Sequence, residues 1–165
     1  MSNTRVERVE RFVASARAYC RLIEGERRLQ RPEFLRKAAR LLAALVHDAL
    51  DLPEVRTRSQ RTLGEVVDPD PGRELFPALQ NKLGDVDPFW VVFDPRVEEK
   101  PVCGSLADCL ADVHRDVKRG LLAWDSWGEE GRHEAVWKWK FDFASHWGYH
   151  ALEALHAIYW RALRD

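Results

Sequence analysis

The chain has 165 residues, carries 26 basic and 27 acidic side chains, and is 45% hydrophobic. This length corresponds to one domain, residues 1–165, whose core is large enough to fold without a disulfide or a structural metal ion. The near-neutral charge and the hydrophobic content exclude a disordered chain and a histone-like binder of the nucleic-acid backbone.

The N-terminal residues and the cysteines bear on the cellular compartment. Residues 1–7 contain no apolar signal region, and the longest aliphatic run, residues 41–46, is far shorter than the roughly 20 residues of a membrane span. Cys20, Cys103 and Cys109 are odd in number and form no Cys-x-x-Cys pair, as is typical of free thiols in a reducing compartment. We therefore expect a cytoplasmic protein that does not bind membranes.

The N-terminal third predicts two amphipathic helices. Apolar residues recur at intervals of three and four between Val6 and Ile23, which predicts a helix over residues 4–29. Pro32 suits the first turn of a second helix, which the pair Leu52–Pro53 ends. Because the link between the two helices is short, we expect them to pack as an antiparallel hairpin.

The middle of the chain is less regular. Residues 51–72 have no periodicity and end in Asp-Pro-Asp-Pro-Gly, which predicts a long loop. Residues 74–84 predict a short helix with Pro77 in its first turn. The bulky run 89–93 is either a lone strand or an apolar plug packed on the helices, and the plug is favoured because no pairing partner is visible.

The C-terminal part predicts the two longest remaining helices. Ser105 and Asp108 form a capping-box pattern in front of a long aliphatic series, so one helix begins directly after the serine. After a break at residues 127–131, a last helix is expected over residues 132–163. Alternating aromatics at 137–143 have the period of a strand, but this pattern is short and helical spacing follows it. The sequence thus predicts an all-α bundle of about five helices, with a long loop after the second.

The first 40 residues contain an excess of basic side chains, which can indicate an arm that binds nucleic acid. These side chains are spread around the predicted helix, however, and several have acidic partners at helical spacing, such as Glu7 with Arg11. A solvated helix face explains the pattern better. We therefore expect no nucleic acid among the partners.

Signatures of several enzyme classes are missing. The chain has no Gly-rich phosphate loop, no Gly-x-Ser-x-Gly elbow and no His-Glu-x-x-His zinc motif. Cys103, Cys109 and His114 are potential zinc ligands, but the two cysteines are farther apart than in the usual zinc motifs. Packing in or beside the core is the favoured role of the cysteines. The sequence leaves open whether the protein is an enzyme.

Two rows of polar side chains, one on each of the last two long helices, could bind a metal ion or take part in catalysis. Residues at intervals of three or four form a candidate polar groove where these rows would meet: Asp108, Asp112, Asp116, Asp142, His146, His150 and Glu153. Histidines four residues apart on a helix can share a metal ion, and carboxylates can complete its shell. The metal set would then be Asp108, Asp112, His146 and His150. A structural polar layer, with Arg115 and Arg119 neutralising the acidic row, is the favoured alternative.

Tryptophan is abundant, with seven in the chain. Trp137, Trp139, Trp147 and Trp160 all fall on the predicted last helix, where they would form an interface or pack in the core. Core packing is favoured for this group as a whole. The candidate interface aromatics are Trp90, Trp147 and Trp160.

Several motifs resemble those of a known protein family. They lie at Phe12 to Glu24, Phe93-Asp94-Pro95, Gly104 to Asp116 and Ser145-His146-Trp147-Gly148. With these motifs the chain resembles an uncharacterised bacterial family catalogued as domain of unknown function 5063. In that family an acidic residue is common where this chain has Cys109, and an aromatic one where it has His114. The resemblance implies a small cytoplasmic helical protein and supplies no activity.

The sequence therefore favours a non-enzymatic helical module that binds another protein or associates with itself and needs no cofactor. The missing catalytic motifs and the tryptophan-rich last helix are the grounds for this hypothesis. The alternative is a metal-binding protein or metal-dependent hydrolase, in which the Asp/His cluster would hold a divalent metal ion.

Overall fold

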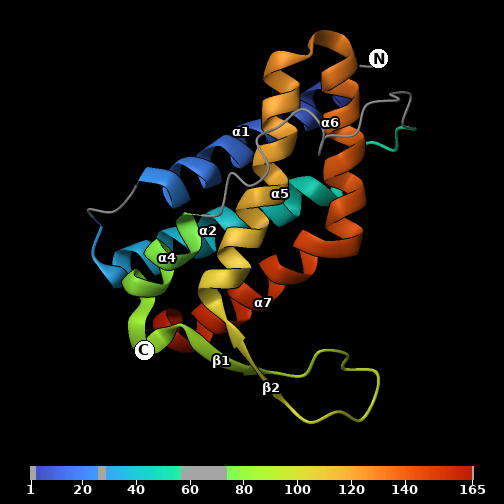
Figure 1. The fold of residues 1–165 in the computed structure, drawn as a ribbon. Coiled ribbons are helices and arrows are strands. Elements are labelled where there is room, and N and C mark those ends of the chain that lie inside the picture. Colours follow the sequence, from blue (N-terminus) through green and yellow to red (C-terminus); the bar gives the residue numbers. More distant parts are fainter. Residues whose placement is uncertain (1–2, 26–28, 57–73, 165) are drawn as a thin grey trace.

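The computed structural model of the protein describes residues 3–25, 29–56 and 74–164 (Figure 1). Its elements are helical apart from one short ribbon of two strands, so the predicted all-α class is confirmed. The α-helices are α1 (Asn3–Gly25), α2 (Arg31–Leu50), α4 (Leu75–Leu83), α5 (Leu106–Ser126), α6 (Gly128–Asp142) and α7 (Gly148–Ile158). Shorter turns are the 3-10 turn η1 (Gly84–Val86) and the π turns η2 (Phe143–Trp147) and η3 (Tyr159–Leu163). No helix among the described residues is both long and apolar enough to cross a bilayer.

Helix α5 is the centre of the bundle. It contacts α1, α4, α6 and α7, which surround it in Figure 1. The predicted hairpin of α1 and α2 is present, and its fully buried Phe12 lies against the rings of Trp139 and Trp147. The hydroxyl of Tyr19 in α1 donates a hydrogen bond to the backbone oxygen of Leu110 in α5 (2.8 Å). The large aromatic side chains of the core are thus buried with their polar atoms paired, as burial requires.

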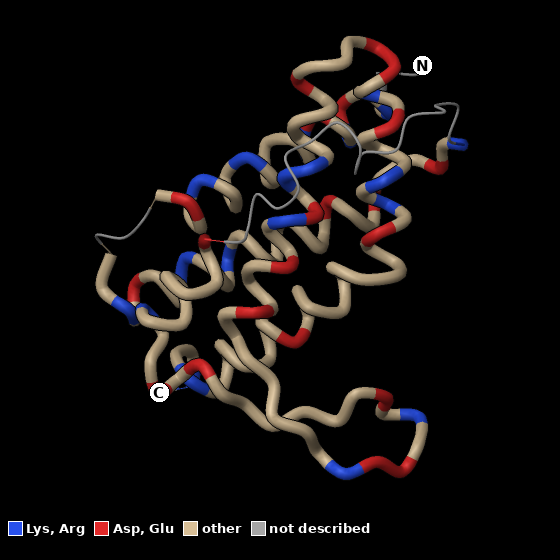
Figure 2. The backbone as a smooth tube through the Cα atoms, viewed as in Figure 1, with Lys and Arg blue, Asp and Glu red and all other residues tan. Residues whose placement is uncertain are grey.

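Arginines of α1 pair with acidic residues of other helices. Arg11 contacts Asp48 (2.7 Å) and also Asp51, and Arg17 contacts Asp125 at the end of α5 (2.6 Å). In Figure 2, basic and acidic residues are intermixed along the helices and in the loop between the strands. Arg11 and Arg17 therefore link α1 to other parts of the bundle, and spacing within one helix does not reveal these contacts.

The apolar run after η1 corrects one prediction. Residues 88–91 are not a plug without a pairing partner but a strand, β1 (Pro88–Val91), that pairs antiparallel with β2 (Val102–Ser105). Trp90 lies opposite Cys103, and Phe89 lies opposite Gly104. The sequence does not predict the partner strand, because Val-Cys-Gly-Ser shows no alternation of apolar and polar residues and has only one β-branched residue. The ribbon and its loop project from one end of the bundle (Figure 1).

The predicted last helix is divided into segments and begins earlier than expected. After α5 the chain reverses at Gly128, whose φ of +64° is costly for any other residue, and α6 starts at this glycine rather than at residue 132. The π turn η2 then separates α6 from α7, and the chain changes direction there (Figure 1). A π turn accommodates one extra residue, so the helical phase before it does not continue after it.

The loop predicted over residues 51–72 is described only in part. Residues 51–56 form no helix or strand, and residues 57–72 lie outside the described part of the chain. The short helix predicted over 74–84 is confirmed as α4, followed by η1.

Of the seven tryptophans, two are fully buried, two are exposed and three are half-buried. Trp139 and Trp147 are fully buried, and their indole nitrogens donate to the backbone oxygens of Val117 (3.0 Å) and Trp139 (3.1 Å). The assignment of Trp147 to an interface is therefore wrong, because its side chain completes the core. Trp90 and Trp160 are exposed, and their role as interface aromatics stays a prediction.

Candidate metal centre

The acidic row of the candidate site is set in place by the start of α5. The Ser105 hydroxyl accepts a hydrogen bond from the backbone N–H of Asp108 (3.2 Å), which confirms the predicted N-cap. Asp87, at the end of η1, binds both the Ser105 hydroxyl (3.0 Å) and the backbone N–H of Ala107 (2.7 Å). This double cap fixes where α5 begins, and hence which of its residues face α7.

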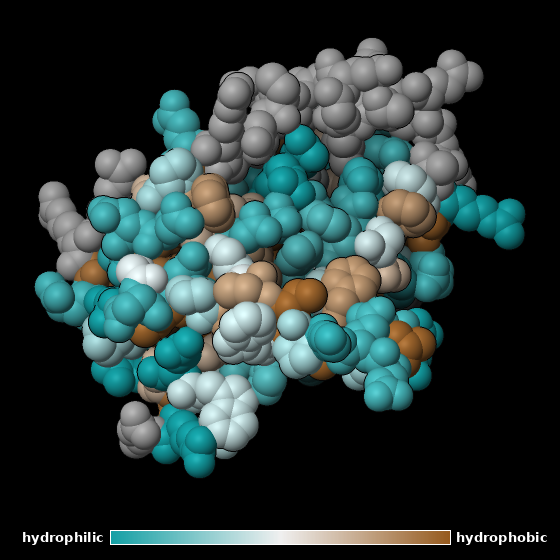
Figure 3. Space-filling view, turned by 60° about the horizontal axis from the view of Figure 1, so that its bottom comes forward, coloured by the Kyte–Doolittle hydropathy of each residue, from teal (hydrophilic) through white to brown (hydrophobic). Residues whose placement is uncertain are grey.

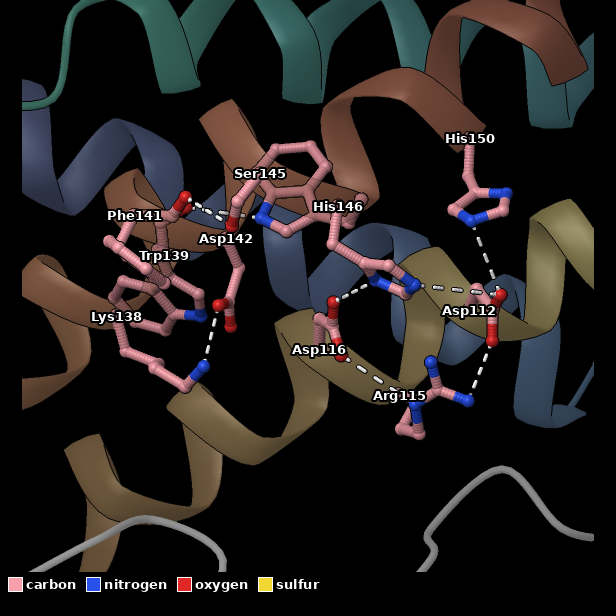
Figure 4. A network of polar contacts seen from close by, with 11 residues as sticks. Asp112, Arg115, Asp116, Lys138, Trp139, Phe141, Asp142, Ser145, His146 and His150 are labelled. Carbon is pink, nitrogen blue, oxygen red and sulfur yellow. Dashed lines mark hydrogen bonds and ion pairs between the residues drawn. The ribbon is translucent and has the colours of Figure 1, made fainter. Parts of the chain in front are cut away.

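The structure brings the two polar rows together at Asp112, Asp116, His146 and His150, and three of these residues form a cluster of potential metal ligands. Asp112 of α5, His146 of η2 and His150 of α7 each offer a ligand atom within 4.8 Å of the other two (Figure 4). Oδ2 of Asp112 lies 3.4 Å from Nε2 of His150 and 4.0 Å from Nε2 of His146. The two imidazole rings meet edge to face at 4.8 Å between centroids. Among the described residues this is the one such group of metal-ligating side chains.

Two neighbours of the cluster hold its members. Nδ1 of His146 lies 2.7 Å from Oδ2 of Asp116, which is only 8% exposed. Arg115 lies between the two carboxylates, with Nη1 2.6 Å from Oδ1 of Asp112 and Nε 3.6 Å from Oδ1 of Asp116. The guanidinium thereby offsets the repulsion within the acidic row, and Figure 4 shows it on the α5 side of the cluster.

The electrostatics favour a neutral imidazole at His150. Burial lowers the pKa of His150 below its ordinary value, although the nearby charge of Asp112 acts in the opposite direction. Its Nδ1 is buried and has no hydrogen-bond partner among the described residues. Only the neutral ring can ligate a metal, so this environment suits a ligand.

Three members of the predicted polar groove lie outside this contact group. Asp142 forms an ion pair with Lys138 (2.5 Å) instead, because η2 changes the helical phase between it and His146. Asp108 is an exposed residue and is not among the three clustered ligands. The partial burial of its carboxyl group, and then the charge of Asp112, raise its pKa. The Tyr149 hydroxyl donates a hydrogen bond to the carboxylate of Glu153, whose Oε1 is buried without a partner among the described residues. The metal set predicted from sequence is thus corrected by removing Asp108.

The alternative zinc set is not assembled. Cys103 is exposed on β2, whereas Cys109 is buried in α5, and burial raises the pKa of its thiol. His114 is fully buried and lies 2.9 Å from Oε1 of Glu24 in α1. The favoured packing role of Cys109 is confirmed.

Sequence reasoning identified Arg115 as a neutralising charge but missed its contact with both carboxylates. Arg115 lies three residues after Asp112, a spacing at which side chains on a helix meet. Asp116 is its neighbour in sequence, and helix spacing predicts no contact between such neighbours. The contact between Asp116 and His146 spans 30 residues and two elements. The sequence indicates a functional role of Asp116 only through the i,i+4,i+8 spacing that it shares with Asp108 and Asp112.

Comparisons with known proteins place the fold. The structure is similar to the crystal structure of protein BF1032 from Bacteroides fragilis, with a TM-score of 0.80 and 18% sequence identity over 93% of this chain and 90% of that chain. At this identity the likeness shows a shared fold. No curated protein matches the chain. The family described as "Domain of unknown function (DUF5063)" matches residues 4–161, and the chain belongs to that family.

Proposed function

We propose that the protein binds one divalent transition-metal ion through Asp112, His146 and His150. The observation that carries the proposal is the convergence of these three side chains, with ligand atoms within 4.8 Å of one another. Asp112 comes from α5, and the two histidines come from successive turns of the segment formed by η2 and α7. Exposed acidic groups commonly gather without a metal, but here two imidazoles face one carboxylate.

The distances are close to those of a metal site. Tetrahedral zinc, with bonds of about 2.0–2.2 Å, places its ligand atoms roughly 3.3 Å apart. The Asp112 to His150 distance is 3.4 Å, and the Asp112 to His146 distance is 4.0 Å. Small side-chain rotations close the remaining gap. The side chain of His146 is 39% exposed, which leaves space for such a rotation about its contact with Asp116.

The donor types point to a class of metal. Imidazole suits zinc, iron, nickel and copper, whereas calcium and magnesium prefer sites made of oxygen ligands. Three protein ligands are the number found in catalytic zinc sites, which keep a position for water or substrate. Three grooves on the described part of the chain are lined by other side chains. The proposal is therefore metal binding and names no substrate.

The test is zinc binding by the untagged protein in competition with a chromophoric chelator. We expect one equivalent to bind, and zinc at about 100 times its Kd to stabilise the fold by about 2.7 kcal/mol. His150→Ala should lower the affinity at least a hundredfold. His156→Ala, which removes an exposed imidazole from the same helix, is the matched control and should bind as the wild type does. Equal affinity of the two variants would contradict the proposal.

We propose as a second function that the groove between β1 and the end of the last helix binds an acidic segment of another protein. Trp90 is 73% exposed and Trp160 is 51% exposed, and both line this groove of about 380 Å³. Arg161 also lines it, and Arg164 stacks on Trp160 at 4.5 Å. Tryptophan and arginine are the side chains most enriched in binding hot spots, and the cationic groups favour an acidic partner.

The surface around the groove favours a small contact with a partner over a broad one. Figure 3 views the molecule from the end that bears the strand ribbon, and hydrophobic residues there form small patches between hydrophilic ones. A broad apolar interface of the obligate kind is therefore not favoured on this side. A short segment anchored by one or two side chains fits better.

The test is the binding of a model peptide of alternating glutamate and leucine. Binding is measured through the tryptophan fluorescence of the protein, at low and at high salt. We expect binding that weakens with salt and falls at least tenfold in Trp160→Ala. Trp137→Ala, which removes a tryptophan stacked on Phe141 in another groove, should not change it. Peptide binding that persists in Trp160→Ala, or a self-association that this variant abolishes, would contradict an acidic partner.

We propose that the protein acts in the cytoplasm. Cys20, Cys103 and Cys109 are all free thiols, and no two of them form a disulfide. Free thiols of this kind persist in a reducing compartment, where transition-metal ions are also available to imidazole ligands.

A further inference from the structure

We infer that Asp116 is a positioning residue, which holds the imidazole proton of His146 on Nδ1 and so leaves the Nε2 lone pair directed at Asp112 and His150. The inference rests on the proposed metal binding, because it assigns the atom of His146 that binds the ion. Nothing in the sequence spacing of the two histidines distinguishes Nδ1 from Nε2 as the ligand atom.

The hydrogen bond to Asp116 determines the tautomer. A carboxylate only accepts hydrogen bonds, so the 2.7 Å contact with Oδ2 of Asp116 requires the proton to be on Nδ1 of His146. In the neutral ring Nε2 then carries the lone pair, and it lies 4.0 Å from Oδ2 of Asp112, which is also an acceptor. A cation between these two acceptors would be coordinated by both.

Arg115 keeps the Asp116 carboxylate in this orientation. Its guanidinium is 2.6 Å from Oδ1 of Asp112 and 3.6 Å from Oδ1 of Asp116. Each carboxylate thus has one oxygen toward the arginine and the other toward the histidines (Figure 4). Outer groups of this kind orient metal-binding histidines in many proteins, and their loss typically lowers metal affinity by about 10–100-fold.

The second histidine provides an internal comparison. Nδ1 of His150 is buried and has no hydrogen-bond partner among the described residues, so no carboxylate holds a proton on that atom. The effect of Asp116 should therefore be confined to His146. A general loss of structure, in contrast, would change the signals of both rings.

The experiment reads the imidazole ¹⁵N shifts of the metal-free protein and then its zinc affinity, in the wild type, Asp116→Asn and Asp125→Asn. Asp125 lies on the same helix and pairs with Arg17 on the surface, so its substitution is a matched control for the loss of one paired carboxylate. We expect the Nδ1–H tautomer of His146 in the wild type and in the control. Asp116→Asn should lose this preference and bind zinc 10–100-fold more weakly, while Asp116→Glu should restore part of both.

Three outcomes would overturn the inference: an Nε2–H tautomer of His146 in the wild type, a doubly protonated ring at neutral pH, or an unchanged zinc affinity in Asp116→Asn. A purely structural role of Asp116 would lower the melting temperature and leave the tautomer unchanged. Because the tautomer is read without metal, a wild-type protein that binds no zinc would contradict the proposed function, whereas a wrong tautomer contradicts this inference.

Discussion

Gly120→Ala is expected to destabilise the fold by about 3 kcal/mol, because α5 and α6 meet at this glycine with no space for a methyl group. A Cβ built there lies 2.1 Å from Nε1 of Trp139, a fully buried residue. Moving the indole also breaks its hydrogen bond to the backbone oxygen of Val117 (3.0 Å). Overpacking typically costs about 1–3 kcal/mol, and an unpaired buried donor costs about 1–3 kcal/mol more.

Urea unfolding followed by circular dichroism measures this loss. Gly25→Ala is the matched control, since a Cβ at that position meets no atom within 4 Å, and we expect it to leave stability unchanged or slightly higher. In a Trp139→Phe background the cost of Gly120→Ala should shrink, because phenylalanine lacks the indole nitrogen that clashes. A Gly120→Ala protein as stable as the wild type would show that the two helices do not meet as described.

Gly148→Ala is expected to disrupt the π turn and, with it, the proposed metal site. A Cβ on Gly148 would lie 2.2 Å from the backbone oxygen of Phe143, so alanine does not fit the turn that contains His146. If the turn reverts to an α-helical phase, residues before it rotate by about 100° relative to His150. We expect at least a tenfold loss of zinc affinity together with a lower melting temperature.

The competition assay and thermal unfolding measure the two effects. Ala144→Gly changes the same turn by removing a methyl group from an exposed position. It should cost about 1 kcal/mol in stability and retain zinc binding. Retention of full affinity in Gly148→Ala would mean that the π turn does not place His146.

Much of the fold follows from local pattern. The apolar spacing of α1, α2 and α5 depends on side chains three and four residues apart, which lie on one face of a helix whatever packs against it. The cap at Ser105 likewise depends on a contact within one turn, and the structure has it where the sequence predicts it. These elements need no knowledge of the rest of the chain.

The candidate site was predictable only as two separate rows. The spacing of Asp112 and Asp116 on one helix, and of His146 and His150 on another segment, is visible in the sequence. Whether the rows meet depends on how the two segments cross, and the π turn decides which residues face α5. Asp142 was therefore assigned to the groove by a helical wheel that does not hold across η2.

By itself, the sequence determined the all-helical class and most helix ends, because these depend on periodicity, caps and breakers within a few residues. The likeness to the family is also in the sequence, but it lies in the motifs and not in the periodicity. Only the tertiary structure decided that β1 has a partner strand, that Trp147 belongs to the core, and that Asp116 contacts His146. Each of these contacts joins residues that are far apart in the chain or on opposite sides of a turn. Their energies come from burial and pairing in the folded state, which no short window of sequence encodes.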